Sequence, residues 1–555
     1  MGPVSASGPQ VGTAFAKEKG QDDELNEREQ DMVNKTLFQT MRGLLMPRAD
    51  ATNASGAPAY LRTPRHQLAQ LAATGTLHPT FHATAEQQLD EVLGLAAQVD
   101  AEFVAKTALY ARERGHMKDM PALLAASLSA RDLGLLQAVF PRVIDQGKML
   151  RNFVQVMRSG VTGRKSMGSR PKKLVQQWLL TATEKQLLNA SVGNDPSLAD
   201  VVKMVHPKPQ EAWRSAWFAW LTGRPFDEHA LPPLTQAFER YKRACAQGEP
   251  AELPDVPFQM LTALDLKAQQ WAQIARQGSW QMVRQNLNTF QRHGVFLLPG
   301  MVERVAAKLR DPGLVARSRV MPYQLLSALL ATGTAVPVEI REALQDALEL
   351  SLANVPELQG RVVVCPDVSG SMSQAVTGHR GSATSSVRCI DVAALVAAAL
   401  LRRNPRARVM PFEQTVVDLP LNPRDSVLTN AKALASVGGG GTNCSAPLAQ
   451  LNREQAPVDL LVMVSDNESW MDARRHGATA TMNEWQKIRQ RNPGARMVCI
   501  DIQPGASTQA PEREDILNVG GFSDAVFGMM ALFAQGGMSP RHWVGEIEKM
   551  TLSLQ

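Results

Sequence analysis

Two patterns of hydrophobic and polar residues divide the chain near residue 356. From about Met32 to Val355, apolar residues recur at helical spacing, as Ile340, Leu344 and Leu348 do at four-residue steps. Pro337 lies just before this run and suits the first turn of a helix. No convincing alternating pattern of a strand appears in this stretch. The pattern therefore predicts an all-α region of many short helices.

The packing of these helices is left open by the sequence pattern. Helices of modest length joined by short connectors suggest helix pairs stacked as a solenoid. No repeat of fixed period aligns, so an irregular all-α domain is the alternative. Residues 1–30 are rich in Gly, Ser and charged residues without a periodic apolar face, which predicts a flexible N-terminal arm followed by a helical module at 31–355.

A different pattern begins at Arg361, where short apolar runs alternate with helical segments. The predicted strands are Val362–Cys365, Ala407–Pro411, Leu460–Val464 and Met497–Ile502, and the predicted helices are Ile390–Leu401, Val427–Ser436 and Met482–Gln490. Such alternation predicts a doubly wound α/β domain over residues 356–555, with a parallel sheet covered by helices on both faces. Ligand sites in such sheets lie beyond the C-terminal ends of the strands.

Composition and charge add limits to this two-part organisation. Hydrophobic residues make up 44% and charged residues 20% of the 555 positions, as in folded proteins. The five cysteines are scattered without metal-ligand spacing, which favours a reducing cytoplasm over a disulfide framework. No signal-peptide segment begins the chain, and no apolar run approaches the roughly 20 residues of a spanning helix, so we expect a soluble cytoplasmic protein without membrane contact. The net charge of +6 says little by itself.

Oxygen-bearing side chains follow the first predicted strand of the α/β domain. Asp367, Ser369 and Ser371 alternate in a turn, and Gly370 allows that turn to bend tightly. Taken alone, this fragment is equally well explained as a capped turn. A hard cation such as Mg²⁺ takes about six oxygens, so further ligands are expected after later strands.

Two further candidate ligands occur in the expected order. Thr442 follows the glycine run 438–441, and Asp466 ends the buried run Leu460–Ser465. With Asp367, Ser369 and Ser371 they resemble the metal-ion-dependent adhesion site of von Willebrand factor A-type domains. The resemblance implies that these five residues hold Mg²⁺, directly or through water, and that an open coordination position accepts a carboxylate from a partner protein. Neither a general base nor a nucleophile accompanies the site, so we expect no enzyme activity.

Basic residues gather in one segment of the helical region. Residues 163–173 carry Arg164, Lys165, Arg170, Lys172 and Lys173 and no acidic residue. The Gly, Ser and Pro residues of this segment predict a loop leading into a helical pattern at 174–180. Cations, hydroxyls and free backbone N–H groups suit phosphates, and a solvated basic loop is the alternative.

Two other segments are candidates for parts of a basic surface. Residues 200–209 hold Lys203 and His206, although a lone histidine is more often structural than a ligand. In residues 110–114, Glu113 lies between Arg112 and Arg114, so a solvated helix face is the favoured interpretation there.

Three segments in this order resemble the helical TROVE module of the Ro family. They are FVAKTALYARERGHM at 103–117, GRKSMGSRPKKLVQQWL at 163–179 and DVVKMVHPKP at 200–209. A TROVE module followed by a von Willebrand A-type domain also matches the family over nearly the whole chain. The resemblance implies HEAT-like repeats closed into a ring by the A-type domain, in a monomeric protein.

The Ro resemblance also implies partners and RNA-binding residues. Ro proteins bind small noncoding Y RNAs on the outer ring surface and single-stranded 3′ ends of misfolded RNAs in the central hole, and some bacterial members are tethered by Y RNA to an exoribonuclease. The implied contact residues here are Arg164, Lys165, Arg170, Lys172, Lys173, Lys203 and His206. The competing hypothesis is a scaffold that recruits protein partners through the metal site. A metal-dependent hydrolase is disfavoured.

Overall fold

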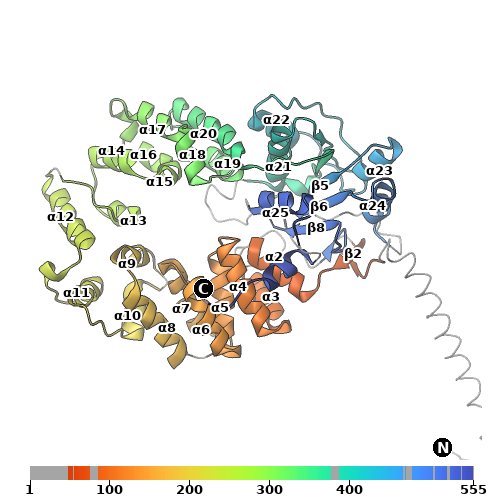
Figure 1. Cartoon of the computed structure of the whole chain (residues 1–555). Helices are drawn as coiled ribbons and strands as arrows, with labels where there is room; N and C mark the ends of the chain where they lie inside the picture. The colour runs from red at the N-terminus through yellow and green to blue at the C-terminus, as the bar shows by residue number, and fades with distance from the viewer. Residues whose placement is uncertain are drawn as a thin grey trace, which may run out of the picture.

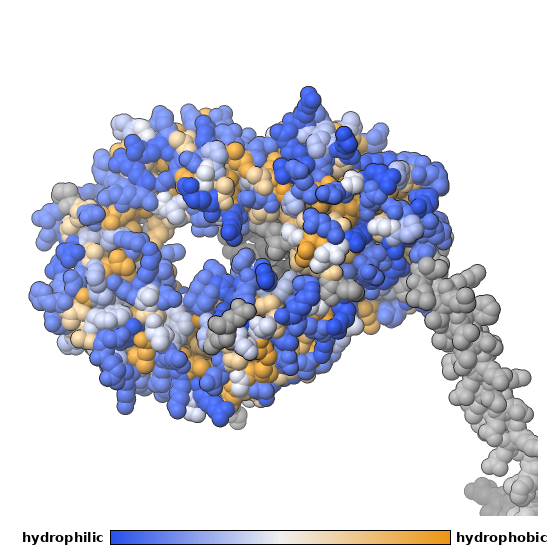
Figure 2. Space-filling model, in the orientation of Figure 1, coloured by the Kyte–Doolittle hydropathy of each residue, from blue (hydrophilic) through white to orange (hydrophobic). Residues whose placement is uncertain are grey.

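The protein forms a ring with a central opening. The computed structural model describes residues 48–53, 56–74, 85–164, 166–194, 196–249, 251–376, 387–466, 469, 478–503, 507–521, 525–538 and 541–553. An arc of helices runs around the ring, and the α/β domain completes it on one side (Figure 1). The space-filling view shows an opening through the middle (Figure 2). The predicted arm at 1–30 and Lys165 lie outside the described residues.

The arc consists of short helices, as the helical spacing predicts. Its first half is α2 (Pro64–Thr74), α3 (Ala85–Gln98), α4 (Ala101–Glu113), α5 (Asp119–Arg131), α6 (Leu133–Val143), α7 (Gly147–Ser159), α8 (Ser169–Thr181), α9 (Glu184–Ser191), α10 (Leu198–Val205) and α11 (Ala212–Leu221). Its second half is α12 (Pro233–Gln247), α13 (Phe258–Thr262), α14 (Ala268–Gln277), α15 (Trp280–Gln285), α16 (Leu287–Arg292), α17 (Met301–Leu309), α18 (Pro312–Ser318), α19 (Pro322–Ala331) and α20 (Val338–Ser351). Ile340, Leu344 and Leu348 are buried on α20, which confirms the predicted face.

At three places along the arc a cationic side chain caps the end of an earlier helix. Arg131, Arg214 and Lys308 each donate hydrogen bonds to carbonyls at the end of an earlier helix, 30 to 35 residues back in the sequence. The acceptors lie in the last turn of a helix or just after it: Ala96 and Val99 at the end of α3, Leu179 and Ala182 at the end of α8, and Ala275, Arg276 and Gly278 at the end of α14. The last carbonyls of a helix lack partners within it and favour a positive charge. These three caps join helices that are close in space but about one helix pair apart in sequence.

The α/β domain contains a five-stranded parallel sheet in the order β4-β3-β5-β6-β8. The strands are β3 (Val362–Pro366), β4 (Arg408–Val409), β5 (Leu460–Ser465), β6 (Arg496–Asp501) and β8 (Ile516–Gly520), and the helices are α21 (Cys389–Arg403), α22 (Val427–Ala435), α23 (Ala446–Arg453), α24 (Ala480–Arg491), α25 (Ala525–Ala534) and α26 (His542–Glu548). The predicted strands and helices are confirmed, although β4 is shorter than 407–411, where Pro411 has no N–H to donate. The elements β8, α23, α25 and α26 were not predicted.

Alternate residues of the central strands face two separate hydrophobic cores. Val462 and Val464 of β5 belong to a core shared with α21, α25 and the helical arc. Leu461 and Met463 face a smaller core that includes Leu448 of α23 and residues of α24. Successive side chains of a strand point to opposite faces, so both faces of the sheet are covered. One face thereby shares its core with the ring.

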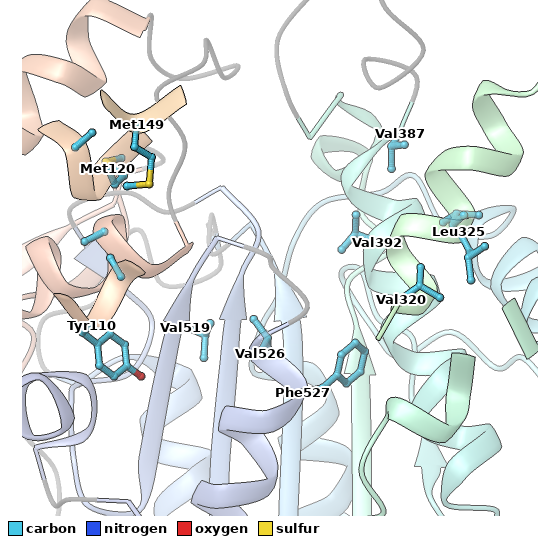
Figure 3. Close-up of a cluster of buried hydrophobic side chains, with 14 of the residues drawn as sticks. Tyr110, Met120, Met149, Val320, Leu325, Val387, Val392, Val519, Val526 and Phe527 are labelled. Carbon is cyan, nitrogen blue, oxygen red and sulfur yellow. The ribbon is translucent and has the colours of Figure 1, made fainter. Parts of the chain in front are cut away.

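Both ends of the helical arc pack against the α/β domain. Two short strands that were not predicted, β1 (Ala51–Thr52) and β2 (Pro58–Leu61), pair antiparallel, and β2 also pairs with β7 (Ser507–Thr508) of the α/β domain. Near the other end, Glu349 of α20 accepts a hydrogen bond from the Val427 N–H of α22 at 2.6 Å. In Figure 3, Tyr110 of α4 lies on one side and Val320 and Leu325 on the other side of Val519, Val526 and Phe527. The α/β domain therefore closes the ring, as expected.

Within the described residues, the structure contains no helix that is both long and apolar enough to cross a membrane.

Candidate functional site

The first candidate metal-binding loop leaves the C-terminal end of β3 and is held by Asp367. One carboxylate oxygen of Asp367 accepts the Ser369 N–H at 2.8 Å, and the other accepts the Ser465 hydroxyl at 2.6 Å. The Asp367 N–H donates to the Val464 carbonyl of the neighbouring strand β5 at 2.8 Å. Asp367 is fully buried, so its carboxylate is fixed in one position.

Three hydroxyl groups lie next to one another beside this carboxylate. The Oγ atoms of Ser369 and Ser371 are 3.2 Å apart, and the Thr442 hydroxyl donates to Ser369 Oγ at 2.8 Å. Thr442 and Ser369 are both buried. Two loops about seventy residues apart in sequence thus bring their hydroxyl oxygens together, as the hypothesis of a shared metal site requires.

The glycine run before Thr442 brings the second loop against the first. Gly438 and Gly439 adopt positive φ angles of 86° and 111°. The Gly439 N–H donates to the Val368 carbonyl, and the Gly370 N–H donates to the Gly440 carbonyl, both at 2.9 Å. A Cβ at Gly438 would lie only 2.2 Å from the Val368 oxygen, so a side chain there is excluded. The glycines thus permit the approach that positions Thr442.

Asp466 is the fifth candidate ligand and places a second carboxylate near Asp367. It follows β5, which is hydrogen-bonded to β3, and it is buried. Burial and, to a smaller extent, the neighbouring Asp466 carboxylate together raise the pKa of Asp367 to about 7, against the opposing effect of the hydrogen bonds from Ser369 and Ser465. Two buried carboxylates and three hydroxyls form a hard oxygen donor set that suits Mg²⁺, whose charge would offset the repulsion between the carboxylates. The five residues therefore fit the expected cation.

Glu413 is a contributor to this site that the sequence reasoning missed. Its side chain accepts the Gly440 N–H at 2.7 Å, and its carbonyl accepts the Asn443 N–H at 2.9 Å. Glu413 thereby holds the chain on both sides of Thr442. The signal was its place just after a strand, where this fold gathers ligands, but an isolated Glu carries no motif.

The basic segment is divided between a loop and a helix. The structure begins α8 at Ser169, so Arg170, Lys172 and Lys173 lie in the first turns of a helix and not in a loop as predicted. Gly168 turns the chain with φ 76°, and Pro171 is compatible with a first helical turn because no N–H is needed there. Arg170 and Lys173 are exposed, and Lys172 is half-buried.

The two basic segments of the sequence, which lie largely on α8 and α10, are neighbours in the ring. Gln176 of α8 donates to the Val205 carbonyl at the end of α10 at 2.5 Å. The lysine pair of α8 lies one turn before Gln176, while Lys203 and His206 are exposed on α10 and its cap. His206 has φ 52°, a left-handed conformation that ends the helix. The structure therefore brings the 163–179 and 200–209 segments together.

Other predicted or weighed basic residues have structural partners. Arg164 donates to the Ser129 carbonyl at the end of α5, so it serves partly as a helix cap. Arg112 pairs with Asp145 at 2.8 Å, and Glu113 pairs with Arg142 at 2.7 Å. The Arg112 side chain is only 10% exposed, so of this segment only Glu113 and Arg114 form the predicted solvated helix face.

Known proteins resemble this chain in sequence and in fold. Residues 361–534 match the family described as the Ro60 vWA domain. An RNA-binding protein RO60 of Deinococcus radiodurans is 26% identical over 87% of this chain and 95% of its own length. An RNA-binding protein RO60 of Caenorhabditis elegans is 23% identical over 42% of this chain and 37% of its own length.

A solved structure has the same architecture. The crystal structure of the Deinococcus radiodurans RO (RSR) protein superposes with a TM-score of 0.62 and 24% identity, covering 86% of this chain and all of that one. At this identity the match shows the fold alone. Residues 361–534 therefore match the Ro60 vWA domain, and the chain is similar to an RO60 protein in sequence and to a RO protein in fold over most of its length.

Proposed function

We propose that this protein is an RNA-binding ribonucleoprotein component of Ro type. The observation that carries the proposal is the joining of α8 and α10 through Gln176, which puts Lys172, Lys173, Lys203 and His206 on adjacent helices. The relatives from Deinococcus radiodurans and Caenorhabditis elegans are both named RNA-binding proteins. Lysine contacts to phosphates give affinity with little reading of sequence.

The proposed ligands are of two kinds. A small noncoding Y-like RNA occupies the basic outer surface of α8 and α10. Single-stranded 3′ ends of misfolded RNA enter the central opening that Figure 2 shows, because single strands are flexible whereas duplexes are wide and stiff. The cellular role we assign is RNA quality control, processing or decay in the cytoplasm, by a monomeric ring that an RNA tethers to an exoribonuclease.

A second candidate function belongs to the metal site. The buried pair Asp367 and Asp466 with three converging hydroxyls supports Mg²⁺ binding. A cation held by these groups would leave a coordination position for a carboxylate of a partner protein. The vWA domain would then recruit proteins to the RNA-bound ring.

Charge reversal on α8 tests the RNA proposal. We expect Lys172→Glu/Lys173→Glu to weaken binding of a structured RNA at least about ten-fold and to lower the slope of log affinity against log salt by about 2, one for each lost phosphate contact. The control is Lys242→Glu/Lys549→Glu, which makes the same charge change at exposed lysines on α12 and α26. Equal affinity of the α8 variant and the control would contradict the proposal.

The central opening is tested separately with a hairpin. A hairpin with a single-stranded 3′ tail should bind the wild-type protein more tightly than the same hairpin with a blunt end. Gel-shift titration measures both, and equal affinities would remove the role of the opening while leaving the basic surface in place.

A further inference from the structure

A polar cavity in the helical arc has no role in the functions described so far. It lies among α13, α14 and α16 and has a volume of about 410 Å³. Its lining includes Phe258, Asp265, Trp271, Arg292 and His293. In Figure 1, α13 lies on the inner side of α12, toward the central opening.

Aromatic rings form one wall of this cavity. The His293 ring stacks on the Trp271 ring with centroids 4.2 Å apart and an angle of 14° between the planes. Phe258 meets Trp271 edge-on at 6.1 Å. Trp271 is buried and His293 is exposed, so the stack runs from the core to the cavity and ends in a ring that solvent can reach. A further planar group can extend such a stack.

Hydrogen-bonding groups of both kinds surround this stack. Asp265 offers an exposed carboxylate that makes no hydrogen bond or ion pair within the described part of the chain. The exposed Arg292 guanidinium is held by the Thr289 hydroxyl at 3.1 Å. The indole N–H of Trp271 is buried and finds no acceptor among the described residues, which is unusual for a buried donor. The cavity thus combines a stacking surface with an acceptor and donors.

We propose that this cavity binds a nucleobase, with guanine preferred, and so deepens the proposed RNA-binding function. A base stacks on His293, extending the ring pair with Trp271. The Asp265 carboxylate accepts the adjacent N1–H and N2–H groups, which among the common bases only guanine presents together. Arg292 faces the phosphate of the same nucleotide. The base comes from a single RNA strand at the inner side of the arc or from a free nucleotide, and the experiment separates these sources.

Calorimetric titration of the full-length protein tests the proposal. The probes are 5′-GMP, 5′-AMP and single-stranded pentanucleotides of G or A. We expect wild type to bind the G probes more tightly than the A probes. Asp265→Asn should lower the affinity for the G probes at least about ten-fold and leave the affinity for the A probes unchanged. His293→Ala should lower the affinity for all four probes. His229→Ala, at another exposed histidine, serves as the control. Asp265→Asn is isosteric and exposed, so it should fold normally.

The outcomes separate this inference from the proposed function. If both cavity variants bind every probe as wild type does, or if wild type binds none of them, the cavity proposal is overturned, whatever the α8 lysine variant does to structured RNA. Wild-type binding of the mononucleotides without tighter binding of the pentanucleotides assigns the cavity to free nucleotides. If GMP binds but no structured RNA does, the RNA function fails and the cavity remains a nucleotide site.

Discussion

At Asp367, burial and a neighbouring charge act in the same direction. Removal from water disfavours the carboxylate, and the Asp466 carboxylate disfavours it again, so the pKa of Asp367 rises to about 7. Hydrogen bonds from Ser369 and Ser465 only partly offset these effects. A bound divalent cation would reverse the balance, because it interacts favourably with both carboxylates. The site is therefore costly without a cation and favourable with one.

Thermal unfolding with and without Mg²⁺ measures this balance. We expect Mg²⁺ to raise the Tm of wild type, because a ligand of the folded state adds about 2.7 kcal/mol at one hundred times its Kd. Asp367→Asn should show no such rise, since it lacks the charge, and should be no less stable than wild type in EDTA. An equal rise in both proteins would place the cation elsewhere.

Glu413 should affect the affinity for Mg²⁺ by holding the loop on either side of Thr442. Glu413→Ala removes the acceptor for the Gly440 N–H and should lower Mg²⁺ affinity at least about ten-fold. Glu413→Gln keeps an acceptor oxygen and should stay close to wild type. Calorimetric titration with Mg²⁺ distinguishes the variants. A loss as large in Glu413→Gln as in Glu413→Ala would mean that Glu413 acts through its charge and not through this hydrogen bond.

At the scale of single elements, the helices of the arc are joined by side chains that cap their neighbours. Arg214 of α11 is almost fully buried, yet it donates to the Leu179 and Ala182 carbonyls at 3.0 and 2.8 Å. It also lies over the Trp213 ring at 4.2 Å and pairs with Glu211 at 3.0 Å. One guanidinium therefore satisfies the end of α8 and fixes the position of α11 on it.

Removal of this cap should destabilise the arc. We expect Arg214→Ala to cost about 2–3 kcal/mol, because it leaves buried carbonyls without a donor. Arg243→Ala is the control, since Arg243 is exposed and pairs with Glu228 on the surface, where a loss of less than about 1 kcal/mol is expected. Urea unfolding followed by circular dichroism gives both values. Similar losses would show that the cap adds no more than a surface ion pair.

At the scale of the whole molecule, the junction of α2 with the vWA domain contains buried charges. Arg62 lies 3.8 Å from Asp501, and both side chains are almost inaccessible. Gln70 of α2 donates to Glu512 at 3.3 Å and to the Asn518 carbonyl at 2.9 Å. Ring closure therefore depends on polar contacts as well as on the shared hydrophobic core.

The buried Glu512 should make this junction sensitive to pH. Burial raises its pKa from 4.5 to about 7, against the opposing effect of Arg62. Between these values the folded state keeps a proton that the unfolded state releases, so this group's contribution to stability is full below pH 4.5 and is lost as pH rises through 7. Glu512→Gln stays neutral and should gain stability relative to wild type over this range. Urea midpoints at several pH values measure the difference, and a constant difference would contradict the prediction.

His66 provides an internal contrast at the same junction. Burial lowers its pKa from 6.5 to about 4. Here the unfolded state binds more protons between pH 4 and 6.5, so stability rises with pH across that window, opposite to the effect of Glu512. In Glu512→Gln the stability loss due to Glu512 is absent and only the gain due to His66 is left. The urea midpoint of this variant should therefore rise more steeply with pH between 4.5 and 6.5 than that of wild type.

Much of the fold could be read from local pattern. The buried faces of α4 and α20 and the strands β3, β5 and β6 follow from periodic or β-branched runs, which depend on neighbouring residues only. The short strands β1 and β2 could not be predicted, because β2 depends on pairing with β7 about 450 residues away and β1 pairs in turn with β2. Helix α8 begins at Ser169, earlier than the predicted 174, because Ser169 and Pro171 fit the first turn of a helix as well as a loop.

The candidate sites likewise contain residues that the sequence predicts and residues that only the structure shows. Asp367, Ser369 and Ser371 stand close in sequence, and the strand order of the fold indicates that Thr442 and Asp466 approach them. Glu413 and the nucleobase cavity have no local signature, because each depends on contacts between separate elements. The helix caps share no motif, since any long cation can reach a carbonyl from a different helical position.

The sequence by itself determined the two-part organisation, most of the helices and strands, and the oxygen ligands of the candidate metal site, because hydrophobic periodicity and short motifs act between near neighbours. Only the tertiary structure decided which helix ends of the arc are capped from a later helix, the closure of the ring at α2 and the adjacency of α8 and α10. Those features depend on hydrogen bonds and packing between residues distant in sequence, and such contacts leave no periodic trace in the chain.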